Sequence, residues 1–417
     1  MGSGRTAQAT DFTSELRRRG QEAFESLPTP VQKDKGWEFT DVSKLDLDAW
    51  HQSDDGNLDA TPARAPVVDS NGWPGVLQVD GATTRRGEAP DGIVVSTLED
   101  AVGEHPELIE RYLGSLLTDR DRFTAQNTAA WRGGMFVYVP AGVRVDRPVI
   151  TSVLHDSASA IHWRSLIVVE EGAEITLAEQ WASSADDLEG YFNPVTELIV
   201  GDGANVEYLC VQDLSERAWI LGSQRAQVGA NANLHWVGLG LGSGQGKLRM
   251  ETDINGAGAT ARVTGAYAGH GSQHLDYETT QEHAAPHTVS DLAFRGVLRD
   301  KATAVWSGMI KVDPGAQRTD AFQESRNLLL TEGAHADAIP GLEIEANDVR
   351  CTHAATVARL DDMNVFYLQT RGLTREEAER MLVGGFLEVI AGRLEGSRFL
   401  HDPVQAALER ELEAVLA

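Results

Sequence analysis

The segment Gly172-Ala173-Glu174-Ile175-Thr176-Leu177 decides the fold, because a tight glycine–alanine turn opens directly into alternating apolar and polar residues. Related units occur at Ala141-Gly142-Val143-Arg144-Val145 and at Gly203-Ala204-Asn205-Val206-Glu207-Tyr208. Glycine lets the chain turn sharply, and alanine is small enough for one turn to stack on the next. The glycines of five such turns are spaced 30, 31, 26 and 27 residues apart, at Gly142, Gly172, Gly203, Gly229 and Gly256. A supersecondary unit that recurs at this period indicates a solenoid.

The repeated units are rich in apolar residues that alternate with polar ones, and no long helical pattern interrupts them. Alternation with a period of two is typical of strands, so the units favour a parallel β-helix over helical repeat arrays. Further turns at Gly315-Ala316 and Gly333-Ala334, with a degenerate one at Asp300-Lys301-Ala302, extend the pattern. We therefore predict a mainly β protein with a β-solenoid core over residues 126–360. A β-sandwich built from hairpins is the alternative that the pattern leaves open.

Both ends of the chain are predicted to be helical. An apolar face runs through residues 11–27, and a second helical region begins at Ser96, which has capping-box spacing to Glu99. Residues 51–92 between them are rich in Asp, Gly, Pro and Ala and are predicted to form loops with a few short strands. Near the other end, Thr374 and Glu377 have capping-box spacing before an apolar stripe. These patterns predict an N-terminal region at 1–125 and a C-terminal helical region at 361–417, which caps the solenoid or docks a partner.

Composition excludes several classes of partner. The 417 residues carry a net charge of −27, which repels nucleic acid and anionic lipid surfaces. No run of about 18 apolar residues is present, so we expect no membrane span. The chain has two cysteines, Cys210 and Cys351, and its first residues lack an apolar signal core. Both observations predict a cytoplasmic protein without a disulfide framework.

A glycine-rich segment, Gly242-Ser243-Gly244-Gln245-Gly246-Lys247-Leu248, is superficially similar to a phosphate-binding loop. That loop requires glycine at 241 and serine or threonine at 248, and both positions are leucine. We therefore predict that this chain binds no nucleotide, and that any ATP hydrolysis belongs to another protein.

Cys351-Thr352-His353 is the candidate metal site, because residues two apart on a strand point to the same face. Thiolate and imidazole suit iron, zinc or iron–sulfur species. Two ligands are too few for a closed site, so a buried cysteine beside a structural histidine is the alternative. An acidic edge lies just before this pair and consists of Glu343, Glu345 and Asp348. Two explanations are open: these carboxylates are simply exposed to solvent, or they bind ferrous iron on its way to the site.

Three stretches together resemble the SufB/SufD family of iron–sulfur cluster assembly scaffolds: residues 123–140, 322–330 and 342–373. They include Phe322-Gln-Glu-Ser-Arg-Asn327 and Cys351-Thr-His353-Ala-Ala-Thr356. The resemblance implies a right-handed parallel β-helix between helical ends. It also implies pairing of a SufB-like and a SufD-like chain through their cores, with a nascent cluster held at the junction. A SufC-like ABC ATPase would dock on residues 361–417.

Within the family, the pattern is most similar to SufD. SufB-like chains carry a cysteine in the stretch that matches 322–327, and this chain has Glu324 and Ser325 there. The resemblance therefore implies that His353, and less strongly Cys351, are ligands of a transient cluster shared with a partner. The residues expected to dock the ATPase are Phe366, Tyr367, Arg371, Met381 and Phe386.

This reading predicts a scaffold subunit without catalysis of its own. A SufB-like core scaffold and a cytosolic β-helix carbohydrate-active enzyme are the alternatives. Whether the chain also forms a homodimer, and whether a reduced flavin serves the complex, stay open.

Overall fold

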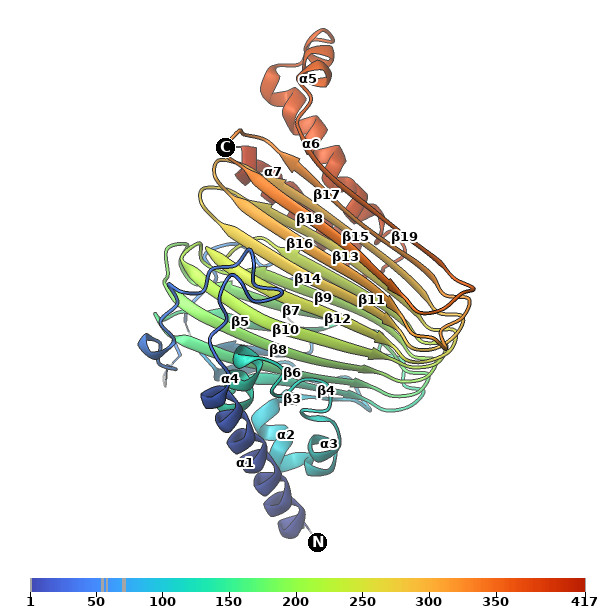
Figure 1. Cartoon of the computed structure of the whole chain (residues 1–417). Helices are drawn as coiled ribbons and strands as arrows, with labels where there is room; N and C mark the ends of the chain where they lie inside the picture. Colours follow the sequence, from blue (N-terminus) through green and yellow to red (C-terminus); the bar gives the residue numbers. More distant parts are fainter. Residues whose placement is uncertain (1, 54–55, 58, 70–72, 417) are drawn as a thin grey trace.

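The computed structural model describes residues 2–53, 56–57, 59–69 and 73–416 and confirms a parallel β-solenoid with helices at both ends (Figure 1). Each turn contributes one strand to each of two sheets. The ten-stranded sheet contains, in spatial order, β19 (Arg350–Arg359), β17 (Asp320–Leu329), β15 (Val289–Leu298), β13 (Thr260–Gly269), β11 (Asn233–Gly240), β9 (Asn205–Asp213), β7 (Glu174–Ser183), β5 (Val149–His155), β1 (Val76–Val79) and β2 (Ala82–Arg86).

The nine-stranded sheet faces it across the solenoid interior. Its spatial order is β18 (His335–Ile344), β16 (Thr303–Val312), β14 (His274–His283), β12 (Gln245–Ile254), β10 (Ala218–Val228), β8 (Gly190–Val200), β6 (Ala160–Val169), β4 (Gly134–Val139) and β3 (Val94–Thr97). The β1–β2 and β3–β4 pairs are antiparallel, whereas the stacked turns pair in parallel.

The glycine–alanine turns form corners as predicted, but two of the five evenly spaced turns are out of phase with the prediction. Gly142, Gly172 and Gly203 have φ of 71°, 64° and 67°, a left-handed conformation that favours glycine. In the next two units the left-handed residues are Asn231 and Gly258, two positions after the glycines that we named. The shift follows from the stacking alanines, because Ala232 and Ala259 are the fully buried residues of those corners.

The solenoid interior is a packed core. Four tryptophans are fully buried in it, and aromatic rings fill the space that interior glycines leave open. A Cβ atom on Gly240 would lie 1.8 Å from the hydroxyl of Tyr277, and one on Gly265 would lie 2.3 Å from the ring of Phe294. These glycines therefore make room for rings in the next turns, and the interior is not an open channel.

Helices cover the first turns of the solenoid. α1 (Gly2–Ser26) packs against α2 (Leu98–Glu104), α3 (Pro106–Tyr112) and α4 (Arg122–Ala130), with the short helix η1 (Leu47–Ala49) between α1 and β1. The predicted cap at Ser96 and Glu99 is wrong. Thr97 caps α2 by accepting from the Asp100 amide, and Glu99 instead accepts from the Gly133 amide at 2.6 Å. Spacing alone could not distinguish the two neighbouring hydroxyl residues.

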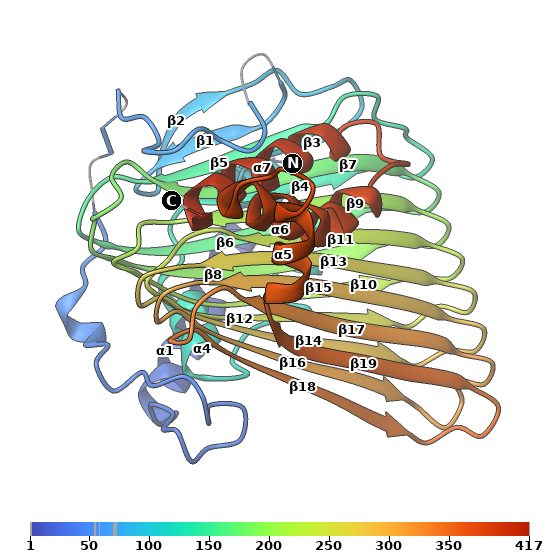
Figure 2. The same cartoon turned by 90° about the horizontal axis from the view of Figure 1, so that it is seen from above.

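The C-terminal region contains α5 (Asp362–Gln369), α6 (Arg375–Gly392) and α7 (His401–Leu416), and the capping box of Thr374 and Glu377 is confirmed. Apolar residues of α6 and α7 pack on the outer face of the ten-stranded sheet, against residues such as Leu209, Val237 and Leu239. α5 extends beyond the last turn (Figure 1), and α5, α6 and α7 lie close together when the molecule is seen from above (Figure 2). The helices therefore lie along one side of the solenoid and leave its last turn open.

A charged cluster holds α7 to the solenoid. Asp213, at the end of β9, contacts Arg64 at 2.9 Å and Arg410 of α7 at 3.5 Å. Glu411 is buried beside them, and burial together with the charge of Asp213 raises its pKa from about 4.5 to about 7. These groups come from three distant parts of the chain, so the cluster ties the N-terminal segment, the core and the last helix together.

Glu411→Gln is expected to become more stable relative to wild type as the pH rises. Between pH 4.5 and 7 the folded chain binds more protons at Glu411 than the unfolded chain does, so this residue lowers wild-type stability as pH rises through that window. Over the whole window, wild type should lose on the order of 3 kcal/mol of unfolding free energy relative to Glu411→Gln. Denaturant unfolding at pH 5 and pH 8 checks this, with exposed Glu409→Gln as the control. A difference between Glu411→Gln and wild type that is the same at both pH values would contradict it.

Candidate functional site

The last turn of the solenoid exposes residues that belong to its interior. Leu342 and Ile344 of β18 pair in register with Ile310 and Val312, both fully buried, yet they are 37% and 41% exposed. Val357 of β19 pairs with buried Asn327 and is 43% exposed. Among the described residues no further strand pairs with the outer edges of β18 and β19. The open end therefore presents a cross-section of the core with exposed apolar side chains, a feature typical of interaction surfaces.

Cys351 and His353 lie on β19 at this open end. Cys351 pairs in register with Ala321 and His353 with Gln323, and both partners are fully buried. Because alternate residues of a strand share a face, both side chains belong to the interior row of the last turn. Cys351 is half-buried against the apolar cluster around Ile310, whereas His353 is exposed. The structure thus places the two predicted ligands side by side in the open cross-section.

The two groups differ as ligands. Burial, and to a lesser degree the charge of Asp320, raise the pKa of the Cys351 thiol above its ordinary value. A thiol binds metal as its thiolate, so this environment makes Cys351 a weaker metal ligand at neutral pH. The imidazole of His353 reaches solvent directly and is the more accessible donor.

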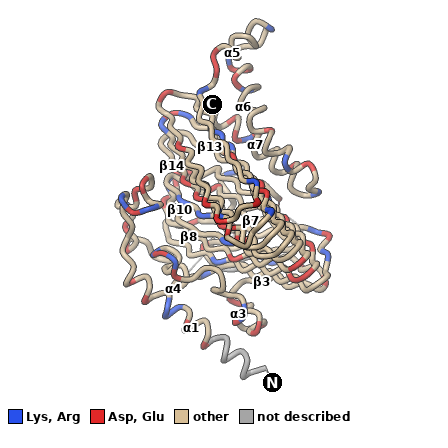
Figure 3. Tube along the Cα trace, turned by 45° about the vertical axis from the view of Figure 1, so that its right-hand side comes forward, with Lys and Arg blue, Asp and Glu red and all other residues tan. Residues whose placement is uncertain are grey.

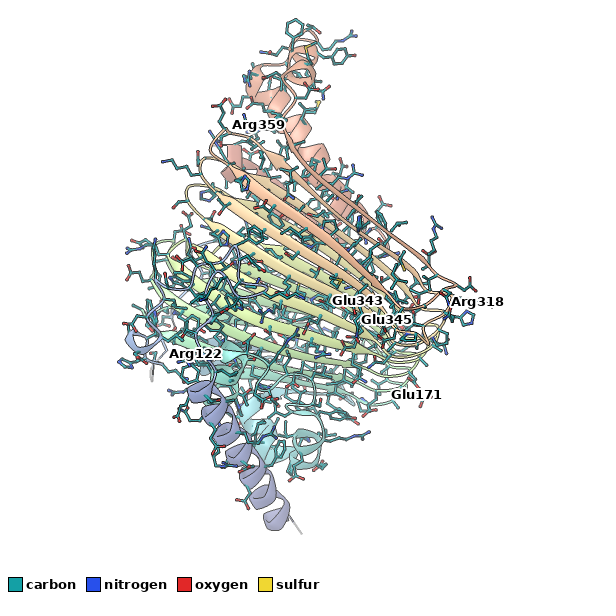
Figure 4. All side chains as sticks on the ribbon, viewed as in Figure 1. Arg122, Glu171, Arg318, Glu343, Glu345 and Arg359 are labelled. Atoms are coloured by element: carbon teal, nitrogen blue, oxygen red, sulfur yellow. The ribbon has the colours of Figure 1, made fainter. Side chains whose placement is uncertain are left out.

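The part of the chain that the structure describes contains no group of three or more His, Cys, Asp or Glu residues placed to hold a metal ion. The acidic edge before Cys351 does not complete such a group. Glu343 and Glu345 are exposed at the end of β18, well separated from Arg359 at the far end of β19 (Figure 4). Asp348 lies 3.6 Å from Arg318 in the neighbouring corner.

The glycine-rich segment 242–248 leads into β12. Its lysine, Lys247, is 4% exposed and contacts Asp276 at 2.8 Å and Glu278 at 3.5 Å. This ammonium group is therefore held by carboxylates on the outer face of the nine-stranded sheet, and it lies 5.6 Å from the centre of the Trp37 ring.

A second exposed apolar surface lies on α5 and the first half of α6. Phe366, Tyr367 and Met381 are 59%, 56% and 55% exposed, and Arg371 stacks on the ring of Tyr367. Phe386 differs from the other predicted docking residues, because it packs between α6 and the sheet beneath the guanidinium of Arg295.

Sequence reasoning missed some members of these surfaces. Met363, at 70% exposure, belongs to the α5 surface, and Leu342, Ile344 and Val357 belong to the open end. Two signals in the sequence could have revealed them. Met363 is an apolar residue one helical turn before Phe366, and the other three residues continue the interior rows into the last repeat.

Acidic residues outnumber basic ones in the chain, and along the Cα trace the two kinds are interspersed (Figure 3). No helix in the described part of the chain is long and apolar enough to cross a membrane.

These features define a β-solenoid protein with two exposed apolar surfaces, one at the open end and one on a projecting helix pair. The chain belongs to the SufBD family of iron–sulfur cluster assembly proteins. Residues 152–386 match the SUF system FeS cluster assembly SufBD core domain, and residues 78–150 match the SufBD protein N-terminal region.

Curated relatives agree with this assignment. The iron–sulfur cluster assembly protein SufD of Bacillus subtilis is 31% identical over 93% of this chain and 91% of its own length. Iron–sulfur cluster assembly SufBD family proteins of Staphylococcus saprophyticus and Staphylococcus aureus are 30% identical over 71% of this chain and 64% of theirs. The chain is thus a SufD-like iron–sulfur cluster assembly protein, and the alternative of a carbohydrate-active enzyme is set aside.

Proposed function

We propose that this chain is the SufD-like scaffold subunit of a three-component assembly. Its open end pairs with a SufB-type chain, its α5–α6 surface binds a SufC-type ATPase, and an iron–sulfur cluster is built where the two solenoids meet. The observation that carries the proposal is the placement of His353 in an exposed cross-section of the core, since a partner that covers the apolar rows must also cover this imidazole.

The cluster is cargo in this scheme, so its ligands must hold it and then release it. A neutral imidazole from His353 supplies one nitrogen donor, and Cys351 contributes less because its thiol is harder to ionise. The remaining ligands come from the partner chain. A site divided between two proteins opens when they separate, which provides a route for transfer.

The ATPase would act through the projecting helices. α6 continues from the exposed α5 surface to the outer face of the ten-stranded sheet, where Ile390 and Ala391 are buried. Movement of α5 by a bound ATPase would therefore pull on the solenoid through a rigid element, in the manner of a rigid-body switch.

Co-purification of this chain with SufB-type and SufC-type partners from its own cell, followed by anaerobic reconstitution with iron, sulfide and ATP, tests the assembly. A stable ternary complex that gains a cluster spectrum supports the proposal. If no complex forms and this chain alone binds a cluster, the SufB-like alternative replaces it.

Replacing Phe366 and Tyr367 together with serine is expected to weaken binding of the ATPase about 100-fold. Loss of two exposed aromatic anchors costs roughly 3 kcal/mol of binding free energy. Calorimetric titration of the purified chain with the ATPase measures the change. Phe39→Ser, which removes an aromatic side chain that is 41% exposed in the N-terminal segment, is the matched control. If the double variant binds the ATPase with unchanged affinity, the ATPase docks on a different surface of the chain.

A further inference from the structure

One buried polar atom next to the candidate site has no partner. Gln323 lies on β17, fully buried in the interior row, and its amide nitrogen donates to the carbonyls of Gly308 at 3.3 Å and Gly341 at 3.0 Å. Its Oε1 atom is buried and accepts no hydrogen bond. A buried acceptor left unpaired costs about 1–3 kcal/mol, so it calls for an explanation.

The orientation of this amide is fixed by its surroundings. Both contacts of the nitrogen are carbonyl oxygens, which only accept, so the amide cannot be turned over to exchange its nitrogen and oxygen. A Cβ atom on Gly308 would lie 2.6 Å from Gln323 Oε1, so the glycine there leaves room for the oxygen. The chain thus holds an acceptor in the interior, one turn below the open end.

His353 is the residue of the next turn that shares the row of Gln323. It pairs in register with Gln323 and shares its interior row, while β19 is the last strand of its sheet. An exposed imidazole can change rotamer, and a neutral imidazole carries one N–H donor and one acceptor nitrogen.

We infer that Gln323 is a positioning residue for His353: its Oε1 accepts the ring N–H, which fixes the tautomer and leaves the other nitrogen free to bind metal at the interface. The inference rests on the proposed function of His353 as a cluster ligand. A histidine that binds metal through one ring nitrogen generally donates the N–H of its other ring nitrogen to such an acceptor, and this hydrogen bond also sets the ring orientation.

The hydrogen bond can be tested on the isolated full-length chain, without partners or cluster. With ¹⁵N-histidine labelling, an imidazole N–H that is held in a hydrogen bond exchanges slowly with water and gives an observable proton signal. His353→Asn identifies the signal by its disappearance. Gln323→Met should abolish the same signal, because the thioether is a poor acceptor of similar size.

Gln281→Met is the matched control for packing. Gln281 is a second interior glutamine with an unpaired buried Oε1, but it lies on β14 in the other sheet. The inference requires that Gln281→Met retain the His353 signal. Absence of the signal in wild type, or its persistence in Gln323→Met, would overturn the inference. Neither result depends on cluster assembly, so the proposed function would stand or fall separately.

Discussion

Replacing His353 with alanine is expected to lower cluster yield in the complete assembly by at least about 10–100-fold, the range seen when only an outer partner of a metal ligand is lost. The side chain is exposed on a terminal strand, so its removal opens no cavity in the free chain. Because the free chain would lose the proposed hydrogen bond to Gln323, the free energy of unfolding should fall by no more than about 1–3 kcal/mol. Anaerobic reconstitution followed by absorbance at the cluster bands measures the yield.

Two neighbours on the same strand supply the comparison. Thr352→Ala changes an exposed residue of the opposite row and should leave the yield unchanged. Cys351→Ser should reduce it less than His353→Ala, because the raised pKa of the thiol already limits its role. If the complex still assembles and His353→Ala gives the wild-type yield, the imidazole is not a cluster ligand and the chain is a structural subunit.

The solenoid could be predicted from sequence because its determinants are local. A left-handed glycine and a buried alanine, as at Gly172-Ala173 and Gly203-Ala204, followed by alternating residues, define a turn without reference to any other. The phase of the corners does not follow from the local sequence, since several small residues are adjacent there. Asn231 takes the left-handed conformation in place of Gly229, and only the stacking of Ala232 on the neighbouring turns decides between them.

The candidate site was predicted only in part. The shared face of Cys351 and His353 follows from strand geometry, but their position at an open end depends on which turn is last. The sequence could not establish this, because the repeat degenerates around Asp300. Contacts between segments far apart in the sequence could likewise not be predicted. The cluster of Arg64, Asp213 and Arg410 is an example. Phe386 illustrates the same limit, since the helical pattern could not say that this face of α6 meets the sheet.

Glu197→Ala is expected to destabilise the fold by about 3–5 kcal/mol, the largest stability effect that we predict. Arg164 and Glu197 form an ion pair at 2.7 Å on adjacent strands of the nine-stranded sheet, and both side chains are 0% exposed. The carboxylate also accepts from the amides of Gly114, Leu116 and Leu117, at 2.9, 2.8 and 3.1 Å. The pair therefore anchors the loop after α3 to the first turns of the solenoid.

Removing the carboxylate leaves a buried guanidinium without its counter-charge and three amides without their acceptor, which explains the size of the effect. Denaturant unfolding followed by circular dichroism measures it. Glu189→Ala, which breaks the exposed pair with Arg217, should cost no more than about 1 kcal/mol. The double variant Arg164→Met with Glu197→Leu should recover part of the loss, because it removes the unpaired charge along with its partner. If Glu197→Ala is no more harmful than Glu189→Ala, water must reach the pair, and the first turns are less tightly packed than the structure indicates.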